Sequence, residues 1–288
     1  MRSRGWMVGL LALVLVAAFG VYLGSRDFSA PTLRLPEPTR DCTVDAGEAG
    51  DPVRLDADQM ANAATIVAIG ARRDVSERGV VVALATAMQE SKLENLTHGD
   101  RDSVGLFQQR PSQGWGKPEQ IQDPRYAARK FYEGLAKVRG WEDMRVTDAA
   151  QRVQRSAYPE AYEKWADDAA VLAAAFLGRA TGAVACTVQG KPAITGAAAA
   201  LALTKGLVGD WGRLETTAAG HLPGLAVPAA DAQSGWRYAH WLVAHATGHG
   251  VKRVAFGGMQ WSADEGSWTK IEGGGVAGQV VAEVFGDV

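Results

Sequence analysis

The feature that most constrains the fold of this chain is an apolar stretch, residues 80–88, that runs directly into Gln89, Glu90 and Ser91. Nearly every position in it is Val, Ala, Leu or Met, so a helix formed here has no polar face and must be buried among other elements. Ser76 is a suitable N-cap for such a helix. The stretch therefore predicts a buried central helix that carries Glu90 at its end.

Other helices are indicated by apolar residues at helical spacing. A first helix is expected from Asp56, because Met60, Ala64 and Val67 fall on one face. Further helices are expected at about 125–138, 147–157, 159–177, 195–208 and 236–249.

The remaining segments have the composition of loops and short strands. Residues 94–124 are rich in Gly, Pro, Asp, Ser and Gln, which predicts loops, with a small hairpin possible around 104–107. Residues 251–256 and 280–285 have the pattern of short strands. Together with the helix at 236–249 they predict a small α/β module near the C-terminus.

Composition places the chain among globular proteins, with 47% hydrophobic and 22% charged residues. Its formal net charge is −2. The first 26 residues hold three of the 30 basic side chains and no acidic one, so the remainder has 27 basic and 32 acidic side chains, or −5. Such a surface has no broad basic field for phosphate backbones, which argues against nucleic acid as a partner.

The N-terminus predicts export. An uncharged apolar run at 6–23 follows Arg2 and Arg4, and it has the length of a minimal transmembrane helix. A cleaved signal peptide is the alternative, but Tyr22-Leu23 occupies the place where a small-x-small cleavage site is needed. We favour a single-pass membrane anchor at 1–26 and a proline-containing linker at 27–55. Both interpretations place the rest of the chain outside the cytoplasm, and the second makes the protein secreted.

The two cysteines, Cys42 and Cys186, fit that location. An even number of cysteines outside the membrane suggests a disulfide, which here would bracket the central part of the chain. Two buried thiols are the alternative.

Glu90 is the strongest candidate for chemistry, because it lies between an apolar helix and a polar, Gly-rich loop. Partial burial of a carboxyl group favours its neutral form, which can donate a proton to a leaving oxygen. Cleavage of a glycosidic bond requires such a general acid. A solvated glutamate at a helix end is the ordinary alternative, and Glu90 alone does not exclude it.

The residues after Glu90 add a pattern. A Glu-Ser pair at 90–91 ends the helix, a Ser/Gly-containing turn follows at 99–104, and Gly-Leu-Phe-Gln occupies 105–108. Together these resemble the signature of soluble lytic transglycosylases and goose-type lysozymes, which has methionine where this chain has Phe107. An Asp-Pro pair at 123–124, just before the next expected helix, also matches.

The resemblance implies a role for each matching residue. Glu90 would be the catalytic acid, and residues 105–108 would form a strand along the wall of the substrate groove. Trp115 lies in a loop with a glycine on each side, and it could stack on a sugar ring or close a small core instead. The residues expected to bind the substrate are Ser91, Ser103, Gly105, Phe107, Gln108, Gln109, Trp115, Gln154, Tyr158 and Tyr162.

The chain departs from the family in one motif. The helix that should carry Ala-Tyr-Asn reads Ala-Ala-Gln-Arg-Val-Gln at 149–154. Tyr158, Tyr162 or Gln154 could substitute for the missing side chains, and the sequence does not choose among them.

A second carboxylate decides between two reactions. Goose-type enzymes carry an aspartate in the loop before the glycine-leucine motif, and Asp100 or Asp102 matches that place. Such a group, of which Asp100 is our candidate, would activate water and give hydrolysis. Without it, attack by the sugar's own hydroxyl would give an anhydro product. Loop capping is the more ordinary role for Asp100.

The resemblance implies a mainly α, lysozyme-like domain at 56–178, with a small β element at its groove. A connecting segment with an Ala-rich helix is expected at 179–219, and the small α/β module at 220–288. One N-terminal transmembrane helix would precede them. Residues 102–162 and 236–261 are also similar to modules of exported actinobacterial cell-wall proteins.

The C-terminal part contains several histidines, so metal binding needs to be considered. Residues 221–228 are similar to a zinc-peptidase pattern that starts at His221, but Pro228 replaces its aspartate ligand. His245 and His249 have a spacing that can chelate zinc on a helix. Because one ligand is missing, we expect no metal and no cofactor.

These expectations favour cleavage of the glycan strands of peptidoglycan at the cell surface, with Glu90 as general acid. The reaction would be that of a lytic transglycosylase or a muramidase. The alternative is a non-catalytic cell-wall-binding or scaffold protein that keeps the groove, and the missing Ala-Tyr-Asn motif is its main support.

Overall fold

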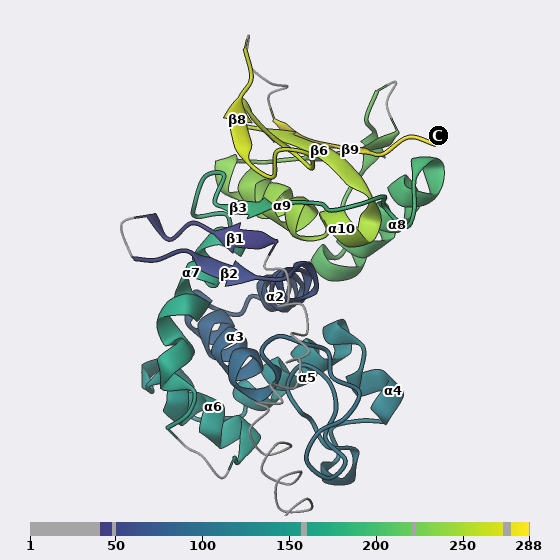
Figure 1. The fold of residues 1–288 in the computed structure, drawn as a ribbon. Helices are drawn as coiled ribbons and strands as arrows, with labels where there is room; N and C mark the ends of the chain where they lie inside the picture. The colour runs from purple at the N-terminus through teal and green to yellow at the C-terminus, as the bar shows by residue number, and fades with distance from the viewer. Residues whose placement is uncertain (1–40, 48–49, 157–159, 221–222, 273–277, 288) are drawn as a thin grey trace, which may run out of the picture. The chain divides into compact units, whose positions relative to one another are not determined.

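The apolar stretch of the sequence forms helix α3 (Glu77–Ser91), which is buried along most of its length. The computed structural model describes residues 41–47, 50–156, 160–220, 223–272 and 278–287. Within them, the helices that pack around α3 are α2 (Ala57–Ala71), α5 (Pro124–Leu135), α6 (Val146–Gln154) and α7 (Ala166–Phe176) (Figure 1). The predicted buried central helix is confirmed.

Helix α3 ends abruptly, and this places Glu90 beside a loop. Lys92 and Leu93 both adopt left-handed backbone conformations, with φ of 58° and 65°, which is uncommon and costly for residues other than glycine. The side chain of Gln59 donates to the carbonyl of Lys92 at 2.9 Å, and that of Asn62 donates to the carbonyl of Leu93 at 2.8 Å. Helix α2 thus holds the turn that terminates α3.

Shorter elements join these helices. They are the 3₁₀ turns η2 (Pro111–Gln113), η3 (Trp141–Asp143) and η4 (Glu163–Trp165), and the single-turn helix α4 (Pro118–Ile121). Later in the chain come α8 (Gly196–Trp211), α9 (Ala232–Ala244) and α10 (Ala246–His249). The helices expected at 195–208 and 236–249 are therefore confirmed, the second as two consecutive helices.

A three-stranded antiparallel sheet brings the two cysteines together. Its strand order is β2 (Val53–Leu55), β1 (Cys42–Val44), β3 (Val184–Cys186). Cys42 lies directly opposite Cys186 in the register of β1 and β3, with Cα atoms 4.0 Å apart, and the two form a disulfide. The predicted disulfide is confirmed.

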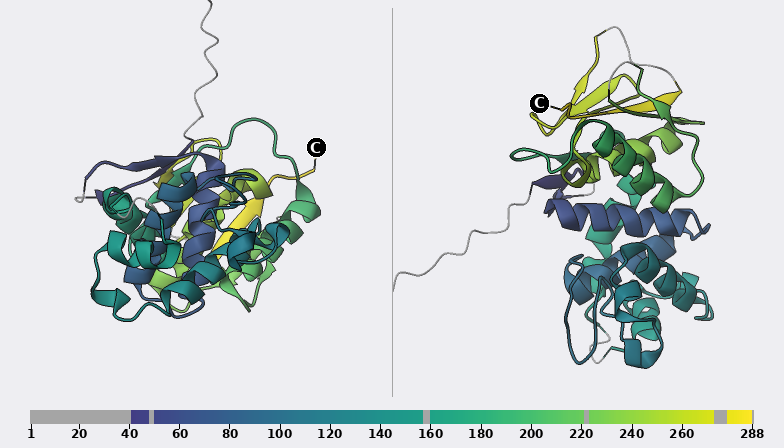
Figure 2. Two further views of the ribbon diagram at one scale, coloured as in Figure 1. Left: turned by 90° about the horizontal axis from the view of Figure 1, so that it is seen from below. Right: turned by 90° about the vertical axis from the view of Figure 1, so that its right-hand side faces the viewer.

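A six-stranded antiparallel sheet is formed by the C-terminal part. Its strand order is β4 (Thr217–Ala218), β5 (Gly224–Pro228), β9 (Gln279–Val284), β6 (Val251–Phe256), β7 (Met259–Ser262), β8 (Trp268–Lys270). Helix α9 packs against β6 and β9, and on its other side it contacts α2 and α7. Figures 1 and 2 show α2 and α9 between the helices around α3 and this sheet.

The predicted fold class is therefore wrong. A mainly α domain with a small β element at its groove and a small α/β module was expected, whereas the structure is about 46% helix and 16% strand, with two antiparallel sheets. Residues 42–44 and 53–55, expected in a linker, are paired strands. Strands of three residues are too short for an alternating pattern to be visible in the sequence, and β3, the second pairing partner of β1, lies far away along the chain.

The predicted transmembrane helix at 6–23 lies outside the described residues. Among the residues that are described, no helix is long and apolar enough to cross a membrane.

Candidate active site

Glu90 lies at the end of α3, half-buried, and its carboxylate has a specific partner. The hydroxyl of Tyr162 donates to Glu90 Oε1 at 2.7 Å. Tyr162 is itself fully buried, one residue before the turn η4. Of the three side chains that could substitute for the missing tyrosine and asparagine, Tyr162 is the one in contact with Glu90, while Tyr158 lies outside the described residues.

The ionisation of Tyr162 is suppressed by its surroundings. Burial raises the pKa of its hydroxyl well above the usual range, and the nearby Glu90 carboxylate raises it further. Tyr162 therefore stays protonated at physiological pH and acts as a permanent hydrogen-bond donor to Glu90.

The same turn also fixes the residue before Glu90. The indole Nε1 of Trp165 donates to Gln89 Oε1 at 2.9 Å, and the ammonium group of Lys92 lies 4.2 Å from the centre of the Trp165 ring. Burial lowers the pKa of Lys92, and Lys164 lowers it further. Two aromatic side chains of one short segment thus hold consecutive residues at the end of α3. Tyr162 was among the predicted site residues, whereas no sequence pattern pointed to Trp165.

Residues 105–108 form a tight turn, where a strand was expected. The turn is closed by a single bridge between Val104 and Gln109. Gly105 has a φ of 78°, and a Cβ atom there would lie 2.7 Å from the carbonyl oxygen of Ile121, so both the conformation and the space require glycine. The predicted strand was wrong, because the positive φ of Gly105 bends the chain into a compact turn at this motif.

Hydrogen bonds connect this turn to α3, the helix that carries Glu90, and to α6. Ser91 Oγ donates to the carbonyl of Leu106 at 2.8 Å, and Gln154 Nε2, from α6, donates to the carbonyl of Phe107 at 2.7 Å. The ring of Phe107 is buried and stacks on Phe131 of α5 at a centroid distance of 4.8 Å. Ser91 and Phe107 therefore position the turn and are not exposed to a ligand, whereas Gln154 lies at the surface of the cavity described next.

An open cavity of about 480 Å³ surrounds Glu90. We call it the groove. Among the residues predicted to bind the substrate, Ser103, Gln108, Gln109, Trp115 and Gln154 line it. Ser103 and Gln109 are almost fully buried, and Gln109 Nε2 donates to the carbonyl of Ala127, so these two mainly support the wall.

The two aspartates before the turn have different environments. Asp102 accepts hydrogen bonds from Arg110 Nε at 2.8 Å and from the backbone and hydroxyl of Ser112 at 2.7 and 3.0 Å. The contact with Arg110, followed by those with Ser112, holds the pKa of Asp102 well below its usual range. Asp102 is therefore a structural carboxylate. Asp100 has a side chain that is 89% exposed and lies at the groove with Glu90.

Several lining residues had no assigned role. Arg101, Arg110, Gln113 and Arg155 all contribute to the groove. Arg155 follows α6 in a left-handed conformation with φ of 54°, which turns the chain toward the groove. In the sequence, Arg155 is marked only by its position directly after Gln154, and a single basic residue is too common to predict a binding role.

The histidines of the C-terminal part lie in packed environments. His240 is buried between backbone groups, and His245 stacks on Trp241 at 3.8 Å between ring centroids. Across the described residues there is no group of three or more His, Cys, Asp or Glu side chains that could hold a metal ion. His221 lies outside those residues.

Comparison with known proteins adds no family assignment. No protein-family model matches the sequence, and a search of curated proteins finds none that is similar to it.

Proposed function

We propose that this protein cleaves glycosidic bonds in the glycan strands of peptidoglycan, with Glu90 as the general acid. The observation that carries the proposal is the hydrogen bond from the buried Tyr162 hydroxyl to Glu90, which lines an open, polar groove. A solvated helix-end glutamate needs no such partner. The resemblance of residues 90–91 and 105–108 to lytic transglycosylases and goose-type lysozymes supports the choice of substrate.

The chemistry follows from the position of one proton. Tyr162 engages Oε1, so we assign proton donation to Oε2 of Glu90. Its proton passes to the bridging oxygen while the bond from that oxygen to the anomeric carbon breaks, and charge develops on the sugar ring. Glu90 is left as a carboxylate that accepts a hydrogen bond from Tyr162 and can take a proton back from the attacking nucleophile.

The nucleophile decides the product. Water would need a second carboxylate as base, and Asp100 is the exposed candidate at the groove. The sugar's own hydroxyl would give an anhydro end with Glu90 alone as acid and base. The groove favours the second reaction, because Asp102 is committed to Arg110 and Ser112, and Asp100 is fully solvated apart from an ion pair with Arg101.

The location that we propose is outside the cytoplasmic membrane. The disulfide between Cys42 and Cys186 supports it, because such bonds persist in oxidising compartments.

Purified sacculi incubated with the full-length protein test the proposal, with the soluble products analysed by mass spectrometry. We expect muropeptides with anhydro ends. Reducing ends would mean a muramidase that uses Asp100. Release of no product from several wall types would reject cleavage and favour a wall-binding protein.

A further inference from the structure

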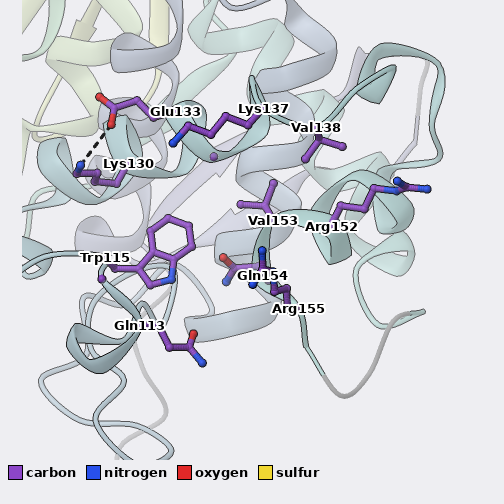
Figure 3. Close-up of a pocket in the computed structure, with 12 residues that line it drawn as sticks. Gln113, Trp115, Lys130, Glu133, Lys137, Val138, Arg152, Val153, Gln154 and Arg155 are labelled. Atoms are coloured by element: carbon purple, nitrogen blue, oxygen red, sulfur yellow. Dashed lines mark ion pairs between the residues drawn. The ribbon is translucent and has the colours of Figure 1, made fainter.

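A second cavity, of about 650 Å³, adjoins the groove (Figure 3). Its walls are the second half of α5 with the residues that follow it, the end of α6, and the loop that carries Trp115. Gln113, Trp115, Gln154 and Arg155 line both cavities, so the second continues the first. We call the second cavity the cationic arm, because Lys130, Lys137, Arg152 and Arg155 supply most of its charge.

The acidic side chain in the cationic arm is already paired. Glu133 forms ion pairs with Arg129 at 2.9 Å and with Lys130 at 3.4 Å. In contrast, no carboxylate of the described residues lies within 4.0 Å of the charged nitrogens of Lys137, Arg152 or Arg155. Among the described residues, the cations of the arm that lack an ion pair within 4.0 Å are therefore Lys137, Arg155 and Arg152, of which Arg152 also interacts electrostatically with Asp148. They line one hollow of a chain whose formal net charge is −2.

The cationic arm also has an apolar side. Trp115, Val138 and Val153 line it and are partly or fully buried by the surrounding helices. Figure 3 shows Val153 between Lys137 on one side and Gln154 with Arg155 on the other, with the Trp115 ring beside Gln154. A ligand that fits such a wall has both aliphatic surface and negative charge.

Neutral sugar rings gain little from unpaired ammonium and guanidinium groups, whereas a carboxylate forms charge-assisted hydrogen bonds with them. We propose that the cationic arm binds the free carboxylates of peptides attached to the glycan strand, while the strand itself lies in the groove. This deepens the proposed function and rests on it. The ligand class is a short aliphatic peptide with at least one free carboxylate.

Binding measurements test this without turnover. The full-length protein with Glu90→Gln is titrated with a disaccharide-peptide that has free carboxylates, and with the same compound after amidation. The comparison is repeated with Lys137→Gln and Arg155→Gln added. Arg139→Gln serves as the matched control, because Arg139 is exposed close to Lys137 and does not line the cationic arm. Thermal melting verifies that each variant is folded, and Lys137→Gln alone supplies the test if the double variant is not.

We expect the double variant to bind the free-carboxylate ligand about three- to ten-fold more weakly, since two partly exposed ion pairs are lost. The amidated ligand should bind weakly to every variant, and the control should match its parent. Added salt should reduce the difference, because it screens exposed charges.

Equal affinities of the double variant and its parent would overturn the proposal. A glycan fragment that bears a phosphodiester and no peptide is included, and a loss of affinity seen with that fragment alone would also overturn it. Cleavage of sacculi by the wild type is scored separately. If cleavage fails while the charge-dependent binding holds, the proposed function is wrong and the binding site stands.

Discussion

At the scale of single residues, the contact between Tyr162 and Glu90 defines the site. The hydroxyl is buried, remains protonated and donates to one carboxylate oxygen, so it orients the carboxyl group. In the proposed mechanism the other oxygen donates the proton. Tyr162 is therefore a positioning residue for Glu90.

Replacing Tyr162 with phenylalanine tests this role. A hydrogen bond to a charged group is worth roughly 1.5–3 kcal/mol, so kcat should fall about ten- to a hundred-fold. KM should change little, because the hydroxyl faces Glu90. The control is Tyr132→Phe, which removes another buried hydroxyl that donates to the carbonyl of Ile66 at 3.0 Å. Tyr132 does not line the groove, so kcat should be unchanged. Similar kinetics of the two variants would contradict the assignment.

Sequence reasoning names Glu90 as the candidate acid, and it names Tyr162 only as one of three side chains among which it does not choose. The Glu-Ser pair and the glycine-containing turn are local patterns, so they are visible along the chain. Tyr162 lies 72 positions from Glu90, and only tertiary packing brings it close. Likewise, the sequence does not distinguish Asp100 from Asp102. The hydrogen bonds that give Asp102 a structural role come from Arg110 and Ser112, and only the folded loop brings these residues to it.

At the scale of elements, His240 connects three of them. It lies on α9, and the backbone N–H of Ala183 donates to its Nε2 at 3.0 Å, so that nitrogen is unprotonated. Its Nδ1 therefore carries the proton and donates to the carbonyl of Ala175 at 2.7 Å. The neutral imidazole bridges α9, the end of α7 and the segment that leads into β3.

Burial lowers the pKa of His240 from 6.5 to about 4, which predicts loss of stability in acid. In the unfolded chain the ring takes up a proton as the pH falls below about 6.5, whereas in the folded protein it does so only near pH 4. The free energy of unfolding should therefore decrease between pH 6.5 and 4, by about 3 kcal/mol from this residue. Burial also lowers the pKa of His245 to about 4, and it adds a loss of the same sign.

Urea unfolding at several pH values measures this loss. His240→Gln should be less stable at pH 7 and show a smaller decrease toward pH 4. His98→Gln, at an exposed site, should behave as the wild type does. An unchanged pH dependence in His240→Gln would show that the imidazole is not held neutral.

The elements also show where sequence patterns are informative. Most of the long helices were predicted within a few residues, because apolar positions recur over several turns. The helix expected at 159–177 is an exception, since α7 begins only at Ala166, after the 3₁₀ turn η4. Strands β6 and β9 were found because each spans six residues. The strands β1, β2 and β3 have three residues each and were missed. The disulfide between β1 and β3 was inferred from the even cysteine count and the expected export of the chain, without these strands.

At the scale of the whole molecule, buried residues from the helices around α3 and from the six-stranded sheet belong to one core. Asp210 of α8 is fully buried within it. Its Oδ2 accepts from Thr65 of α2 at 2.8 Å and from the indole of Trp241 of α9 at 2.7 Å, and its Oδ1 forms an ion pair with Arg125 of α5. One carboxylate thus links four helices.

Removing that carboxylate should destabilise the molecule as a whole. Asp210→Ala leaves two buried donors without their acceptor, which typically costs about 1–3 kcal/mol each. The lost ion pair adds less, because the Arg125 side chain is 40% exposed. Calorimetry should show one transition at a lower temperature, with the groove and the sheet unfolding together. Asp264→Ala, at an exposed turn, should change little. Two separate transitions would indicate that the two parts unfold independently.

The most direct test of the account is the cleavage of sacculi by Glu90→Gln. The amide is nearly isosteric and can still accept from Tyr162, so the fold should be kept, but it cannot donate the proton. We predict that the rate of product release falls about 10²–10⁴-fold while binding to sacculi persists. Glu94→Gln, at an exposed position just beyond α3, should keep wild-type activity. Undiminished release by a folded Glu90→Gln protein would contradict the assignment of Glu90 as the general acid.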